Sequence, residues 1–148
     1  MKIKKIKFSK VREVKTPTRG TPGSAGLDFY IPEGINASIP AGGDICIPSG
    51  LRVDVPKGHA FVAHNKSGVA LKKKLTVGAC VVDEDYQGEV HLHLFNIGDS
   101  TVTLEPGEKI TQFLLIPVQY PDVEVVPDKE LFYSKSTRGS GGFGSTGV

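Results

Sequence analysis

Apolar and polar side chains alternate along much of the chain with the period of two that is typical of β-strands. The alternation is clearest in residues 89–96, where Val90 begins an apolar row on one face and His91 begins a second row on the other. Such a segment predicts a strand with one face on the core. Strands are expected within residues 2–11, 24–32, 39–50, 51–58, 59–64, 89–96, 101–104, 110–118 and 123–126.

Turn-forming residues separate these segments at short intervals. The 148 residues include 18 glycines and 10 prolines, and few windows favour a helix. A chain of this length builds a single core. We therefore predict one all-β domain, a jelly-roll-like β-sandwich.

Residues 78–90 predict a β-hairpin. Two apolar segments flank an acidic turn that carries Asp83, Asp85 and Tyr86. A turn held between two paired strands would fix a carboxylate beside an aromatic ring. This hairpin is the first candidate for an active site, and a plain surface turn is the alternative.

Charge and cysteine content narrow the class of protein. The formal net charge of +2 is too small to support non-specific nucleic-acid binding. The N-terminus lacks the continuous apolar run of a signal peptide, and no later segment has the length of a membrane span. Cys46 and Cys80 are too few for a disulfide framework, and the histidines show no zinc-binding spacing. These features predict a soluble cytoplasmic protein that binds neither nucleic acid nor membranes.

Two short segments could bind an anion or a metal. Lys66, Ser67 and Gly68 follow an expected strand, and a cation, a hydroxyl and exposed N–H groups suit an anion, especially if a helix begins here. A capped turn without ligand explains the same residues, so both interpretations stay open. Asp28 lies among apolar residues, where an unpaired carboxylate is costly. It is expected in a structural ion pair, in a metal or phosphate site, or in both.

The glycine-rich segment of residues 135–148 has the composition of a flexible linker. However, Arg138 can place its guanidinium on a phosphate, and Phe143 can stack on a base. Ser145 and Thr146 add hydroxyl donors. These side chains favour a lid that becomes ordered over a nucleotide.

Five motifs follow one another along the chain, at residues 25–28, 66–68, 78–88, 107–112 and 138–147. Together they resemble the motifs of the homotrimeric all-β deoxyuridine triphosphatases (dUTP pyrophosphatases). The resemblance extends over almost the whole chain, and the acidic turn and the glycine-rich tail carry the most specific motifs. It implies hydrolysis of dUTP to dUMP and pyrophosphate.

The resemblance also implies residue roles. Asp83 would deprotonate a water for in-line attack on the α-phosphorus. Tyr86 would pack under the deoxyribose and leave no room for a 2′-hydroxyl, while main-chain groups read uracil. The implied nucleoside-binding residues are Val77, Gly78, Ala79, Cys80, Val81, Val82, Tyr86, His91, Phe143 and Gly144, and the implied phosphate-binding residues are Lys66, Ser67, Gly68, Gln112, Arg138, Ser145 and Thr146.

The same resemblance implies Mg²⁺ as the cofactor and a homotrimer with shared active sites. Mg²⁺ would ride on the triphosphate and contact the protein mostly through water, with Asp28 as the side chain that would reach it in this way. Residues 1–134 would form the core, and residues 135–148 would form a lid over the active site of a neighbouring subunit.

Three residues depart from the common family pattern, and two other functions remain compatible with the fold. Lys66 and Lys109 stand where arginine is frequent, and Cys80 stands where glycine is frequent. One alternative is a dCTP deaminase, whose arginine-serine-serine motif is absent at residues 66–68. The other is a non-catalytic or moonlighting regulatory trimer, although an intact Asp83 favours catalysis.

Overall fold

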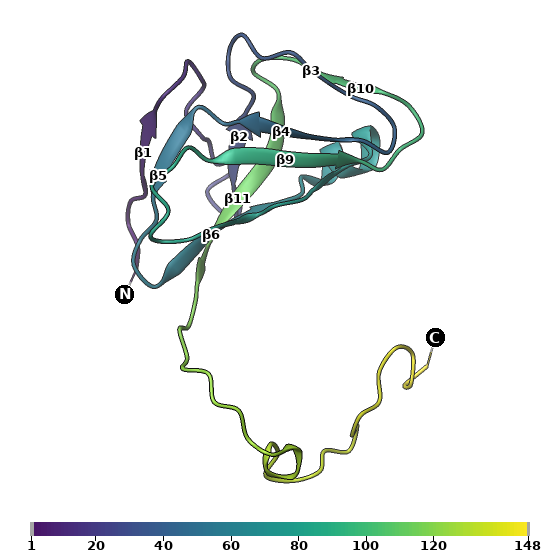
Figure 1. Ribbon diagram of the computed structural model, residues 1–148. Coiled ribbons are helices and arrows are strands. Elements are labelled where there is room, and N and C mark those ends of the chain that lie inside the picture. The colour runs from purple at the N-terminus through teal and green to yellow at the C-terminus, as the bar shows by residue number, and fades with distance from the viewer. Residues whose placement is uncertain (1, 148) are drawn as a thin grey trace.

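Eleven short strands and two helical turns form the structure, a computed structural model that describes residues 2–147 (Figure 1). The all-β prediction is therefore confirmed. The strands are β1 (Lys7–Lys10), β2 (Leu27–Tyr30), β3 (Ala37–Ile39), β4 (Asp44–Pro48), β5 (Leu51–Asp54), β6 (His59–His64), β7 (Leu75–Val77), β8 (Val81–Val82), β9 (His91–Asn96), β10 (Val102–Leu104) and β11 (Lys109–Pro117), and the helical turns are η1 (Val69–Lys73) and η2 (Asp128–Glu130).

Two sheets form the main layers. One has four strands in the order β2-β11-β6-β8, and the other has three strands in the order β4-β9-β7. The strand pairs β1-β5 and β3-β10 complete the fold. Side chains from both main sheets, such as Phe113 of β11 and Leu94 of β9, belong to one buried cluster. The layers therefore pack as a β-sandwich, as predicted.

Phenylalanine rings fill the centre of the core. The ring centroids of Phe29 and Phe113 lie 4.3 Å apart, and Phe61 stacks on Phe113 at 4.9 Å. Phe8 of β1 packs edge-on against Phe29 and Phe61 at 5.9 Å. Such pairs contribute about 0.5–1.5 kcal/mol each beyond the burial of their area. The cluster shows that β1 turns Phe8 inward and packs it against side chains of β2 and β6.

The predicted hairpin of residues 78–90 is wrong. β8 pairs with β6, whereas β9 pairs with β4 and β7, so the two apolar segments belong to different sheets. A main-chain hydrogen bond of 2.8 Å from Ala63 N–H to Cys80 C=O extends the contact with β6. The acidic turn therefore connects the two layers of the sandwich instead of joining two neighbouring strands.

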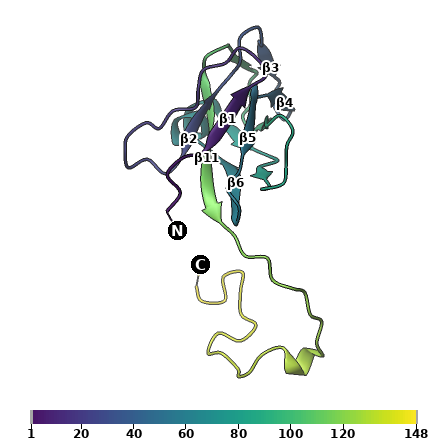
Figure 2. The same cartoon turned by 90° about the vertical axis from the view of Figure 1, so that its left-hand side faces the viewer.

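The chain leaves the sandwich after Val118, whose N–H donates to the C=O of Gly58 at 2.9 Å. Residues 119–147, here called the arm, then extend away from the core in both views (Figures 1 and 2). The strand expected over residues 123–126 does not form, because this segment has no partner strand within the described chain. Val123 is accordingly 92% exposed.

The arm begins before residue 134, where the sequence placed the end of the core. The division into a core and a lid over a neighbouring subunit stays a prediction. None of the helical segments within residues 2–147 has the length and apolar character needed to cross a membrane.

Candidate active site

A hollow of about 200 Å³ lies beside the acidic turn, at the end of β8. It brings together Asp83 and most of the residues assigned to the nucleoside, with Val77 and Gly78 just before it in the chain. Sequence reasoning missed Val90 and Phe113, because apolar residues of expected strands carry no signal beyond that of the core. We call this hollow the turn pocket, and its lining residues are Ala79, Cys80, Val81, Val82, Asp83, Tyr86, Val90, His91 and Phe113.

Tyr86 is fixed at the turn pocket by contacts local to the acidic turn. Its N–H donates to the C=O of Asp83 at 3.2 Å, and its hydroxyl donates to the C=O of Glu89 at 2.7 Å. Gly88 lies against the ring, since a Cβ at that position would be 2.6 Å from the Tyr86 Cζ atom. A side chain at position 88 would displace the Tyr86 ring from its present place and from its bond to Glu89.

The Asp83 carboxylate is exposed and contributes to the turn pocket. Within residues 2–147, no lysine, arginine or histidine forms an ion pair with it. A free carboxylate of this kind can accept a hydrogen bond, and then a proton, from water. The adjacent Glu84 has a structural contact instead, because its Oε2 accepts the N–H of Gly58 at 3.1 Å.

Glu89 supports the turn from its far end. Its carboxylate accepts hydrogen bonds from Arg12 Nε at 2.8 Å and from Gly50 N–H at 2.9 Å. Burial by itself would raise the pKa of the Glu89 carboxyl. The hydrogen bonds from Arg12 and Gly50 have the opposite and larger effect, so the pKa lies below its ordinary value. Local sequence patterns could not identify this residue, because Arg12 lies 77 positions away.

A second hollow, of about 440 Å³, lies where β6 leads into η1. It brings together four predicted phosphate-binding residues, three from residues 66–68 and one, Gln112, from β11. The Gln112 side chain is held by a bond of 2.8 Å from its Nε2 to the C=O of Asn65. The lysines that line this hollow favour binding of a polyanion. We call it the lysine pocket, and its lining residues are Lys66, Ser67, Gly68, Val69, Lys72, Lys73 and Gln112.

Asp28, buried on β2, is paired with two lysines. Its Oδ1 lies 2.5 Å from Lys66 Nζ, and its Oδ2 lies 3.8 Å from Lys109 Nζ. The predicted ion pair is confirmed, and Lys66 is the closer partner. Among residues 2–147, no group of three or more His, Cys, Asp or Glu side chains could hold a metal. Asp28 therefore fits an anchor for Lys66 and does not fit a direct metal ligand.

The two pockets involve opposite faces of β11. Gln112 lines the lysine pocket, and Phe113 lines the turn pocket. Consecutive side chains of a strand point to opposite faces of its sheet. A small ligand therefore cannot occupy both pockets of the same chain, because the sheet lies between them.

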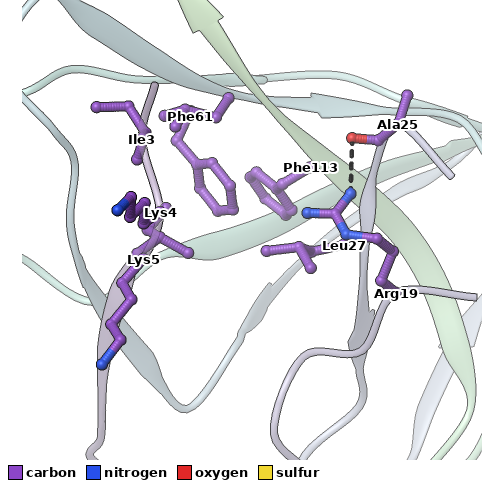
Figure 3. A pocket seen from close by; sticks show the side chains of 10 residues that line it. Ile3, Lys4, Lys5, Arg19, Ala25, Leu27, Phe61 and Phe113 are labelled. Atoms are coloured by element: carbon purple, nitrogen blue, oxygen red, sulfur yellow. Dashed lines mark hydrogen bonds between the residues drawn. The ribbon is translucent and has the colours of Figure 1, made fainter. Parts of the chain in front are cut away.

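A third hollow, of about 240 Å³, lies between the N-terminal segment and β11 (Figure 3). Phe61 and Phe113 form part of its apolar wall. The Arg19 guanidinium donates to the C=O of Ser24 at 2.6 Å and to the C=O of Ala25 at 3.3 Å. Arg19 thereby holds the loop that leads into β2. None of the residues assigned to a nucleotide from the sequence lines this hollow.

The predicted lid residues lie in the arm, and the structure does not bring them to either pocket. The Phe143 side chain is fully exposed, and Arg138 Nε donates to the C=O of Gly141 at 2.7 Å. Residues 144–146 belong to the same exposed segment. Their assignment to a nucleotide stays a prediction.

Comparison with known proteins identifies a protein family that matches this chain. The sequence profile of the dUTPase family matches residues 12–147. The chain is 40% identical over 147 residues to the deoxyuridine 5'-triphosphate nucleotidohydrolase of Polynucleobacter necessarius subsp. necessarius (strain STIR1), with 97% of this chain and 95% of the relative covered. The protein of the same name from Arabidopsis thaliana is 39% identical over 147 residues, with 99% and 82% covered.

Solved structures agree on the fold. A mutant dUTPase of Staphylococcus bacteriophage 80alpha, solved with dUpNHpp, matches with a TM-score of 0.87 and 21% identity over 99% of this chain and all of that one. A mutant dUTPase from phage phi11 of S. aureus, described with a coordinated structural Mg(II) ion, matches with a TM-score of 0.77 and 18% identity over 86% of this chain and 99% of that one.

Proposed function

The chain belongs to the dUTPase family, and from this premise we propose how it hydrolyses dUTP to dUMP and pyrophosphate. The observation that carries the proposal is the exposed Asp83 carboxylate in the turn pocket, which forms no ion pair within residues 2–147. Asp83 takes a proton from a water whose oxygen bonds to the α-phosphorus. The bond from that phosphorus to the bridging oxygen breaks, and pyrophosphate leaves. Positioning of the water supplies much of the rate enhancement.

The turn pocket is assigned to the deoxyuridine. The Tyr86 ring packs under the sugar, and because its hydroxyl is bonded to Glu89 it cannot move aside for a 2′-hydroxyl. Uracil is read by main-chain groups of residues 80–82 and at His91, all of which line the pocket. A strand-like backbone offers donors and acceptors at the spacing of a base edge.

The lysine pocket is assigned to the triphosphate, through Lys66, Ser67, Gly68 and Gln112. Since the turn pocket and the lysine pocket of one chain lie on opposite faces of β11, each nucleotide site combines pockets from different chains. The half-buried apolar residues near the end of β11 support a subunit contact there. A homotrimer with shared sites accommodates this arrangement.

The arm supplies the lid. Phe143 covers the base together with Gly144, and Arg138, Ser145 and Thr146 bind phosphate oxygens. The extension of the arm away from its own core supports a lid that closes over a neighbouring subunit (Figure 1).

We assign Mg²⁺ to the triphosphate and not to a protein cage. When bound, it neutralises phosphate charge. The pairing of both Asp28 oxygens with lysines supports this assignment, because it leaves Asp28 to orient Lys66 and to reach the ion only through water.

Pyrophosphate release with dUTP, UTP, dCTP and dTTP, measured side by side, tests the function. We expect release with dUTP alone. Asp83→Asn is expected to lower kcat by roughly 10²–10⁴-fold while dUMP binding is retained, because the amide cannot take the proton.

Asp85→Asn is the matched control, since Asp85 belongs to the same turn and lies outside the turn pocket. Equal loss of activity in the two variants would contradict the role of Asp83. Ammonia release from dCTP would indicate a deaminase instead.

A further inference from the structure

His93 of β9 holds the main chain that leads into the turn pocket. Its Nδ1 accepts the N–H of Ala79 at 2.9 Å, and its C=O accepts the N–H of Gly78 at 2.9 Å. One residue thus binds two consecutive N–H groups. Ala79 lines the turn pocket, whereas His93 does not.

Asp44 of β4 fixes the tautomer and the orientation of the His93 ring. The His93 Nε2 lies 2.8 Å from Asp44 Oδ2. Since Nδ1 accepts a hydrogen bond from Ala79, the hydrogen-bond network assigns the ring proton to Nε2, which donates to the carboxylate. Asp44 therefore keeps the acceptor nitrogen turned toward Ala79.

Packing allows the segment only one path past the ring. A Cβ at Gly78 would lie 2.6 Å from the Cε1 atom of His93 and 2.6 Å from the Cε2 atom of Phe95. The absence of a side chain at Gly78 lets the main chain approach the two rings closely. The hydrogen bonds then hold the chain at that distance.

We propose that His93, oriented by Asp44, is a positioning residue that sets the shape of the base-binding wall of the turn pocket. The inference rests on the proposed function, which places uracil in this pocket. Because the N–H groups of Gly78 and Ala79 are both bonded to His93, they do not read the base. Recognition of uracil by main-chain donors therefore begins at Cys80.

Two variants of His93 separate the acceptor from the donor. His93→Asn keeps an acceptor near the position of Nδ1, whereas His93→Gln keeps a donor near the position of Nε2 and loses the bond to Ala79. The measurements are KM and kcat for dUTP, the Kd for dUMP by calorimetry, and the Kd for pyrophosphate. His59→Asn is the control, because within residues 2–147 the His59 side chain has a hydrogen bond only with the nearby Lys57 C=O.

We expect His93→Gln to raise KM for dUTP and the Kd for dUMP by about tenfold, since it loses a single hydrogen bond that orders the pocket. The kcat and the affinity for pyrophosphate should be unchanged. His93→Asn keeps the acceptor but loses the bond to Asp44, so its Kd for dUMP should lie between those of the wild type and of His93→Gln. His59→Asn should stay within about twofold of the wild type.

If His93→Asn and His93→Gln weaken dUMP binding equally, the inference is overturned, because loss of ring packing alone would then explain the weaker binding. Unchanged dUMP affinity in His93→Gln would also overturn it. If the wild-type protein fails to hydrolyse dUTP, the proposed function falls and the inference falls with it, whereas the first two outcomes overturn only the inference.

Discussion

Glu89 shows how one residue outside the turn pocket can fix a residue inside it. Its main-chain oxygen holds the Tyr86 hydroxyl, and its carboxylate is tied to Arg12 and Gly50. The carboxylate thus anchors the end of the acidic turn to the N-terminal part of the core. If Tyr86 has the proposed role, selection against a 2′-hydroxyl depends on an ion pair outside the turn pocket.

Glu89→Gln is expected to lower the free energy of unfolding by about 1 kcal/mol at pH 7. The effect is small because Arg12 is half exposed, and an ion pair with a half-exposed partner stabilises the folded state by only about that amount. The folded pKa of Glu89 is lowered, so its contribution is present above the ordinary value of 4.5 and is lost as the pH falls through the folded pKa. Denaturant titrations of both proteins from pH 7 to pH 3 measure this difference. If the difference in the free energy of unfolding between the two proteins does not become smaller below pH 4.5, the charge of Glu89 does not have this role.

At the scale of elements, the acidic turn and the arm share an attachment point. Glu84 accepts the N–H of Gly58, and the C=O of Gly58 accepts the N–H of Val118, where the arm begins. A hydrogen bond to Glu84, with further contributions from burial and the neighbouring carboxylates, raises the pKa of Tyr120. The root of the arm is thus fixed beside the acidic turn, so displacement of one disturbs the other.

Glu84→Ala is expected to lower kcat by about tenfold, because the turn that carries Asp83 loses its side-chain anchor. The pKa of Tyr120 should fall toward its ordinary value of 10.0, as measured by tyrosinate absorbance. Glu33→Ala, at an exposed position of another loop, is the control. A normal kcat together with a lowered Tyr120 pKa would show that the turn does not need this anchor.

The sequence located strands better than it located their partners. Period-two alternation correctly predicted that Leu92 and Leu94 of β9 are buried, since burial depends on local pattern. It could not show that β8 pairs with β6, because either edge offers the same main-chain groups. The failed strand at residues 123–126 has a related cause, since valines favour a strand only where a neighbouring strand exists.

At the scale of the molecule, the residues of the candidate site lie in three separate places: the turn pocket, the lysine pocket and the arm. The sheet separates the turn pocket from the lysine pocket, and none of residues 119–147 lines either of them. The residues of the second motif lie together with Gln112 in the lysine pocket, and residues 79–83 of the third motif lie together in the turn pocket, whereas the assigned residues of the arm lie in neither. The motifs could not show that β11 divides the pockets, because motif order along a chain carries no information about the faces of a sheet.

Mixing two variants that each impair a different pocket tests the shared site; loss of the Gln112 side chain is expected to weaken the lysine pocket enough to abolish most activity. Asp83→Asn and Gln112→Ala chains, unfolded together and refolded at equal amounts, should recover roughly a quarter of the wild-type activity. Half of the turn pockets and half of the lysine pockets would be intact, and they would combine at random. Pyrophosphate release from dUTP measures the recovery.

Asp83→Asn mixed with Tyr86→Ala is the control for this experiment. Both changes lie in the turn pocket, so every turn pocket in the mixture carries one of them. No recovery is expected there. Equal recovery in the two mixtures, or none in either, would show that sites are not assembled from separate chains.

The close approach of Gly78 to the rings of His93 and Phe95 also constrains how this protein can evolve. While both rings are present, any side chain at position 78 meets them, so a mutation there is selected against even if the new residue would suit a different pocket. Smaller residues must replace the rings before position 78 can change. The order of substitutions is thus set in advance, and a lineage that retains both rings also retains the glycine.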